Sequence, residues 1–157
     1  MRAIINKELF KDLVRFYQSY MNMTLLESKV YACLLLDYER EGLSFEELLN
    51  LFMCSKSSLS SILNSLIDAK KIEFYYKTEC RKRFFRLNDL YLEIRLRQLL
   101  KMLQEEIWLA EALMADQKTK KIKNKRTVKD VELYAKHLYK SIENMSLLVG
   151  SISKTEE

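Results

Sequence analysis

Apolar residues recur every three or four positions over most of the chain, which is the spacing of amphipathic helices. Thr24 with Glu27, and Ser44 with Glu47, form capping-box patterns that mark two helix starts. Gly42 is placed to end the helix that Thr24 begins. The pattern predicts helices over about 6–20, 24–42, 44–54, 55–69, 88–116 and 127–150.

The periodicity changes between the fourth and fifth of these helices. Residues 72–76 and 83–87 are aromatic-rich runs of strand length, separated by a polar and charged segment. They predict a two-stranded β-hairpin in a mostly α-helical protein. A lysine-rich stretch at 117–127 predicts an extended basic connector before the last helix.

Composition supports long helices, because the 157 residues include no proline and only two glycines. The net charge of +5 leaves nucleic acid, acidic proteins and anionic lipid surfaces open as partners. Three scattered cysteines lack the spacing of a zinc site or disulfide framework, so we expect reduced thiols in the cytoplasm, no metal and no cofactor. We expect no membrane segment and no secretory signal.

Nothing in the sequence forms a catalytic constellation. The serines have no recognisable base and orienting acid, and there is no glycine-rich phosphate loop. His137 is the only histidine and has no evident partner, so a structural or exposed role is expected for it. The sequence therefore predicts a protein that is not an enzyme.

The predicted helix at 55–69 carries short polar side chains opposite its apolar stripe, and its first acidic residue is Asp68. Serine and asparagine are weaker helix formers than glutamate or lysine, so helix propensity alone does not explain this face. A helix entering a DNA major groove needs short side chains and no carboxylates near phosphates. The predicted contacts are Ser55, Lys56, Ser57, Ser58, Ser60, Ser61 and Asn64. A tight helix–helix contact or a neutral solvent face is the alternative interpretation.

The hairpin next to this helix concentrates positive charge at 77–83. Lys77, Arg81, Lys82 and Arg83 are predicted to contact DNA there, with an arginine at the minor groove, where the negative potential is enhanced. The other hypothesis is a protein–protein adaptor, in which the serine face docks a partner and the basic hairpin is only solubilising.

The segments Ser55–Leu66, Lys71–Tyr76 and Arg81–Leu87 resemble the winged helix of MarR-type transcriptional regulators, particularly the GbsR-like branch. The resemblance covers about 24–87. It implies a winged helix-turn-helix with a hairpin wing, a reading helix in the major groove and Arg81 at the wing tip. It also implies a homodimer, and a cleft that could accept a small apolar effector.

The ends of the chain are expected to make that homodimer, because they carry more apolar surface than a small winged helix could cover. We divide the chain into an N-terminal dimerisation helix (1–22), a DNA-binding domain (23–88) and a helical dimerisation region (89–157). Symmetry would place two reading helices on a palindromic operator. An intramolecular helical bundle is the alternative. The predicted dimer contacts are Leu9, Leu13, Phe16, Leu99, Leu103, Ile107, Tyr134, Leu138 and Met145.

Overall fold

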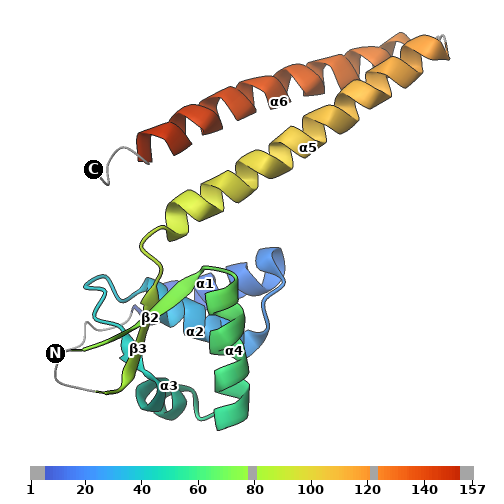
Figure 1. Ribbon diagram of the computed structural model, residues 1–157. Coiled ribbons are helices and arrows are strands. Elements are labelled where there is room, and N and C mark those ends of the chain that lie inside the picture. Colours follow the sequence, from blue (N-terminus) through green and yellow to red (C-terminus); the bar gives the residue numbers. More distant parts are fainter. Residues whose placement is uncertain (1–5, 78–80, 121–123, 153–157) are drawn as a thin grey trace. The chain divides into compact units, whose positions relative to one another are not determined.

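The computed structural model describes residues 6–77, 81–120 and 124–152, in two compact units, Met1–Tyr91 and Leu92–Glu157 (Figure 1). Each unit is described by itself. The first contains α1 (Lys7–Met21), α2 (Leu25–Leu35), β1 (Leu43–Ser44), α3 (Phe45–Phe52), α4 (Lys56–Asp68), β2 (Ile72–Tyr76) and β3 (Arg83–Leu87). The second is built from α5 (Tyr91–Thr119) and α6 (Lys125–Ile152).

Polar caps start the helices of the first unit, as predicted. Both capping boxes form, with the side chains of Thr24 and Ser44 accepting hydrogen bonds from the backbone N–H groups of Glu27 and Glu47. Ser55 caps α4 by accepting from the backbone N–H of Ser58. These bonds satisfy backbone donors that a helix leaves unpaired in its first turn.

Two predicted helix boundaries are wrong. The second helix ends at Leu35, and Gly42 instead lies directly before β1 with a left-handed φ of 70°. The Asn88 side chain accepts from the backbone N–H of Leu90, but α5 begins only at Tyr91.

The sheet has three strands in the order β1-β3-β2, where two were predicted. The two predicted strands match β2 and β3 residue for residue, and Phe74 pairs with Phe85 in their antiparallel register. The two-residue β1 was not predicted; it pairs with the other edge of β3. This leaves β2 at one edge of the sheet.

A single core holds the first unit together and positions α4. Leu59, Leu63 and Leu66 of α4 are buried with Phe85 of the sheet and Val30 of α2. Burial of one such side chain stabilises the fold by about 1.5–3 kcal/mol. The apolar stripe predicted for this helix therefore faces the core, and its polar face is left outward.

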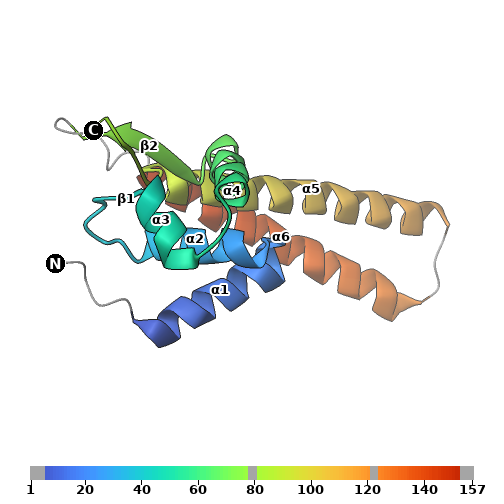
Figure 2. The same ribbon diagram turned by 90° about the horizontal axis from the view of Figure 1, so that it is seen from below.

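In the second unit, α5 and α6 run in opposite directions (Figure 2) and pack against each other in their middle parts. Ile107 and Ala110 of α5 are buried with Ala135 and Leu138 of α6. Tyr134 and Tyr139 of α6 donate hydrogen bonds across the pair to Glu106 and Glu111 of α5. The hydrogen bonds to these glutamates are the main cause of a raised pKa for both tyrosines.

The predicted basic connector at 117–127 is shorter than expected. Helix α5 continues through Thr119 and α6 begins at Lys125, so helix occupies both ends of that stretch. Residues 121–123 lie outside the described residues. Among the described helices, none is both long enough and apolar enough to cross a membrane.

Candidate nucleic-acid interface

The polar face of α4 is exposed over its whole length. Ser57, Ser58, Ser61, Asn64 and Ser65 are all exposed, while the leucines on the opposite face are buried. Lys56 and Ser60 are exposed as well. The short side chains thus form a surface that another molecule can approach closely.

The N-terminus of α4 is electrostatically suited to an anion. Its first turn contains no acidic residue, whereas the first turn of α3 contains Glu46 and Glu47. The partial positive charge at a helix N-terminus therefore has no carboxylate beside it in α4. Ser55 is predicted as a DNA contact, but its Oγ is occupied as the cap, 3.1 Å from the Ser58 nitrogen and 2.7 Å from the Ser58 hydroxyl.

A three-residue turn at Met53–Ser55 joins α3 to α4 and makes a helix-turn-helix. Met53 takes a left-handed φ of 47°, and its N–H donates to the Leu49 carbonyl oxygen at 2.9 Å, which ends α3. This side chain is 91% exposed. A recess of about 350 Å³ lies beside the turn and is lined by Phe10, Lys29, Cys33, Leu51, Phe52 and Met53.

The four cations predicted at the hairpin have different surroundings. Arg81 is exposed, and within the described residues no ion pair or hydrogen bond involves its side chain. Lys82 lies 2.5 Å from a carboxylate oxygen of Glu46, so part of its charge is already neutralised. Of the predicted wing segment 77–83, residues 78–80 lie outside the described residues.

The other two cations lie over aromatic rings on opposite faces of the hairpin. The Lys77 ammonium is 4.3 Å from the centre of the Phe84 ring. The Arg83 guanidinium carbon is 5.5 Å from the centre of the Phe74 ring. Such cation–π contacts restrain the cations without neutralising their charge.

Arg86 lies in β3 together with Arg83, but its side chain is held by neighbouring carboxylates and an aromatic ring. Its guanidinium is 2.7 Å from Glu73 and 3.4 Å from Asp89, and it covers the Tyr75 ring at 4.9 Å. The hydrogen bond to Glu73 is the main cause of its raised pKa. The charge of Arg86 is thus used inside the hairpin.

Sequence reasoning missed the aromatic surface of the wing. Phe74 and Tyr76 are both exposed, on the same face of β2 as buried Ile72. The alternation of side chains along a strand was the signal that could have identified them.

The residues predicted to join two copies divide into two groups. Ile107 and Leu138 are buried between α5 and α6 of one chain, and Leu103 packs against the same cluster. Their contact between copies stays a prediction. Leu9, Phe16 and Tyr134 are exposed, and Leu13, Leu99 and Met145 are half-buried.

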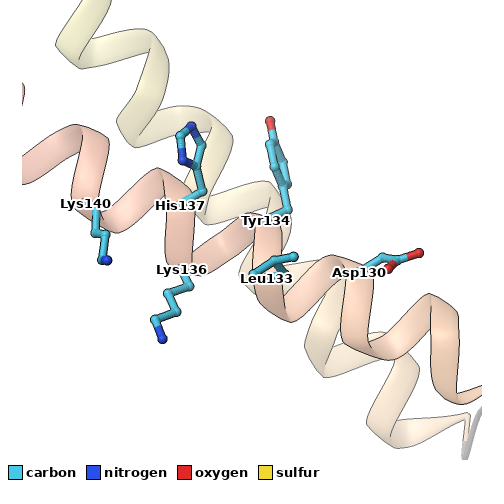
Figure 3. Close-up of a pocket in the computed structure, with 6 residues that line it drawn as sticks. All are labelled: Asp130, Leu133, Tyr134, Lys136, His137 and Lys140. Atoms are coloured by element: carbon cyan, nitrogen blue, oxygen red, sulfur yellow. The ribbon is translucent and has the colours of Figure 1, made fainter.

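His137 lies on an open surface of α6. Figure 3 shows it beside Tyr134 on one side of the helix, with Lys136 and Lys140 extending on the other side. The described residues that line this space of about 680 Å³ come from α6. Over the described ranges, no group of three His, Cys, Asp or Glu side chains could hold a metal ion.

A helix-turn-helix followed by a β-hairpin wing, packed on one core, defines a winged-helix protein. A solved structure shares this fold. A crystal structure of a transcriptional regulator is 20% identical, covers 94% of this chain and 97% of its own, and has a TM-score of 0.59. Likeness at this identity shows the fold alone.

Other solved structures are similar at lower TM-scores. A MarR/EmrR family transcriptional regulator from Acinetobacter sp. ADP1 is 16% identical, with 88% of this chain and 89% of that chain covered and a TM-score of 0.40. A variant of S. aureus MepR is 13% identical, with 87% and 92% covered and a TM-score of 0.43. No protein-family model and no curated protein matches the chain.

Proposed function

We propose that this chain is a sequence-specific transcription regulator that binds double-stranded DNA as a homodimer. Helix α4, at about 55–69, would read the major groove, and the wing at about 77–83 would reach the minor groove. The exposed polar face of α4, which carries no acidic residue before Asp68 at the end of the helix, is the observation that carries the proposal. A similar fold in a solved transcriptional regulator supports it.

The side chains on α4 suit close contact with DNA. Asn64 can donate and accept hydrogen bonds with an adenine edge, while Ser57, Ser58 and Ser61 can bond to bases or phosphates. Base edges line the floor of the major groove, so short side chains allow the helix backbone to approach them closely. Cys54 and Met53 belong to the turn and have no role in this proposal.

Arg81 is the strongest wing candidate, because its exposed charge has no described partner. Lys77 and Arg83 keep their charges while held over aromatic rings, and they would bind the flanking phosphates. Lys82 would contribute less, since Glu46 already pairs with it.

A homodimer would use the apolar surface that the second unit leaves outward. Met102, Leu109 and Leu113 of α5 are each more than half exposed, at spacings of seven and four residues. That spacing is typical of a seam between helices. A twofold axis would present two α4 helices to a palindromic operator, as in the GbsR-like branch of MarR regulators, and a small effector could bind such a dimer.

Selection of bound duplexes from a random pool, repeated across a salt series, tests the proposal. We expect an enriched motif with twofold symmetry, and an affinity that falls steeply with salt because binding releases counterions. Equal weak retention of all sequences would contradict specific regulation. Retention of a protein partner without any DNA motif would favour the adaptor function instead.

Two variants locate the interface on the selected operator. Asn64→Ala should relax the base preference at its position, and Arg81→Ala should weaken binding and reduce the salt slope by about one. Arg15→Ala is the matched control, since it removes an exposed arginine from α1. An Arg81→Ala protein that binds like this control would refute the role given to the wing.

The dimer is tested separately by sedimentation of Leu109→Glu. We expect a monomer with unchanged helix content, because Leu109 is 54% exposed and its loss leaves the α5–α6 core intact. A wild-type protein that sediments as a monomer at all concentrations would overturn the homodimer.

A further inference from the structure

One face of the wing carries an exposed aromatic patch next to an arginine. Ile72, Phe74 and Tyr76 alternate onto the same face of β2, and the register pairs Phe74 with Phe85 and Tyr76 with Arg83. Ile72 and Phe85 are buried, while Phe74 is 41% and Tyr76 60% exposed. This face therefore runs from the core into solvent. We call its outer part, Phe74, Tyr76 and Arg83, the wing platform.

Contacts fix the wing platform in position. The Phe74 ring centre is 6.5 Å from that of buried Phe85, and Tyr76 meets Phe74 edge to face at 6.0 Å. The Arg83 guanidinium lies over Phe74 and is 5.9 Å from the Phe85 ring centre. Each of these side chains packs on one that is closer to the core, so ligand binding would cost little side-chain conformational entropy.

β2 is an edge strand, so no further strand of the sheet pairs beside the wing platform on its outer side. An exposed ring is costly in water unless a ligand covers it, and the Tyr76 ring is the most exposed of the three aromatic rings on this face. The Arg83 guanidinium, which lies over Phe74, favours a ligand with negative charge.

An exposed aromatic ring beside an arginine suits one class of ligand. Nucleic acid supplies a flat base to stack on the ring and a phosphate for the arginine. The base must be unpaired, since both faces of a base inside a duplex are covered by neighbouring base pairs. Duplex reading by α4 does not use these rings.

We propose that the wing platform binds single-stranded nucleic acid, with an unpaired base stacked on Tyr76 and the adjoining phosphate at Arg83. This activity is distinct from the duplex binding proposed for α4. It would let the protein hold a locally opened or single-stranded segment.

The test measures binding of a fluorescent oligothymidylate of about ten nucleotides, within the usual site size for such surfaces. A phosphodiester chain of equal length with abasic sugars is the comparison. We expect the wild-type protein to bind the thymidylate about tenfold more tightly than the abasic chain, because stacking needs bases. Equal affinity for the two chains would overturn the proposal, since charge alone would then explain binding.

Variants of Tyr76 identify the ring. Tyr76→Ala should lose about tenfold in thymidylate affinity, while Tyr76→Phe keeps the ring and the affinity. Tyr38→Ala is the matched control, because Tyr38 is an exposed tyrosine outside the wing. Tyr76→Ala with the affinity of this control would refute stacking, and unchanged thermal unfolding of both Tyr76 variants shows that the fold is kept.

The duplex operator separates this proposal from the proposed function. Asn64→Ala should weaken operator binding and leave thymidylate binding unchanged, with the reverse for Tyr76→Ala. Loss of operator binding alone in Tyr76→Ala would mean that the ring packs on duplex DNA, which overturns the single-strand assignment. Thymidylate binding by a protein that selects no duplex motif would support the wing platform while refuting the regulator.

Discussion

Replacement of Gly42 by alanine is expected to destabilise the winged-helix unit. Gly42 has a left-handed φ of 70°, and an added Cβ would lie 2.8 Å from the Phe85 carbonyl oxygen. It would also lie 3.3 Å from the Tyr75 ring. Phe85 is buried in the central strand, so its carbonyl cannot move away without disturbing the sheet.

The magnitude follows from two costs. A left-handed backbone costs a residue with a Cβ about 1–2 kcal/mol more than glycine. Crowding against a fixed backbone atom adds about 1–3 kcal/mol. Together they give about 3 kcal/mol, which lowers the melting temperature of a unit the size of Met1–Tyr91 by about 12–24 °C.

Gly150→Ala is the matched control, because it makes the same chemical change in a different setting. Gly150 lies in α6, and no heavy atom lies within 4 Å of an added Cβ. Alanine is favoured over glycine in a helix by up to about 1 kcal/mol, so this variant should be as stable as the wild type or more so. Thermal unfolding followed by circular dichroism measures both. A Gly42→Ala protein with an unchanged or raised melting temperature would refute the reasoning.

Three further predictions test the wing, the helical pair and the core. Glu46→Gln removes the carboxylate that neutralises Lys82, so operator affinity should rise by about threefold to tenfold in an anisotropy titration; no gain would contradict a phosphate contact by Lys82. Tyr134 and Tyr139 have pKa values raised above the ordinary 10.0, so their contribution to stability is present below pH 10.0 and is lost as the pH rises through the folded-state values. Changing both to phenylalanine should flatten the alkaline loss of helix signal, and an unchanged pH profile would show that the hydrogen bonds to glutamate do not matter. Leu63→Ala should lower the free energy of unfolding in urea by about 2–5 kcal/mol, because Leu63 is buried on the core-facing side of α4, and a loss below about 1 kcal/mol would be too small for a core residue.

Local patterns in the sequence identified much of the first unit. Both capping boxes and both long strands follow from residues close together in the chain, and the structure confirms them. The strand β1 could not be found this way, because two residues show no periodicity and β1 depends on pairing with β3. Met53 takes a left-handed backbone conformation, which glycine and asparagine adopt more readily than methionine. The residue type therefore did not predict it.

The candidate site was predictable where exposure follows from helix periodicity, and less so where it depends on distant partners. The exposed serine face of α4 follows directly from the buried leucines opposite it. The pairing of Lys82 with Glu46 joins residues 36 positions apart, so it could not be read from either segment alone. That Lys82 is paired with a carboxylate, and is thus a weaker candidate for DNA contact than Arg81, is therefore visible only in the three-dimensional structure.

The dimer prediction shows why apolar content does not by itself identify an interface. Helix α5 carries two apolar stripes: Ile107 belongs to the one covered by α6, and Leu109 to the one left exposed. The sequence predicts that α5 is apolar around most of its circumference but does not say which stripe is covered within the chain. Since α6 covers the first stripe, a second copy would have to pack on the second. Leu109, which is not among the predicted dimer contacts, is therefore a sharper test of the homodimer than Ile107, whose replacement would disturb the α5–α6 core itself.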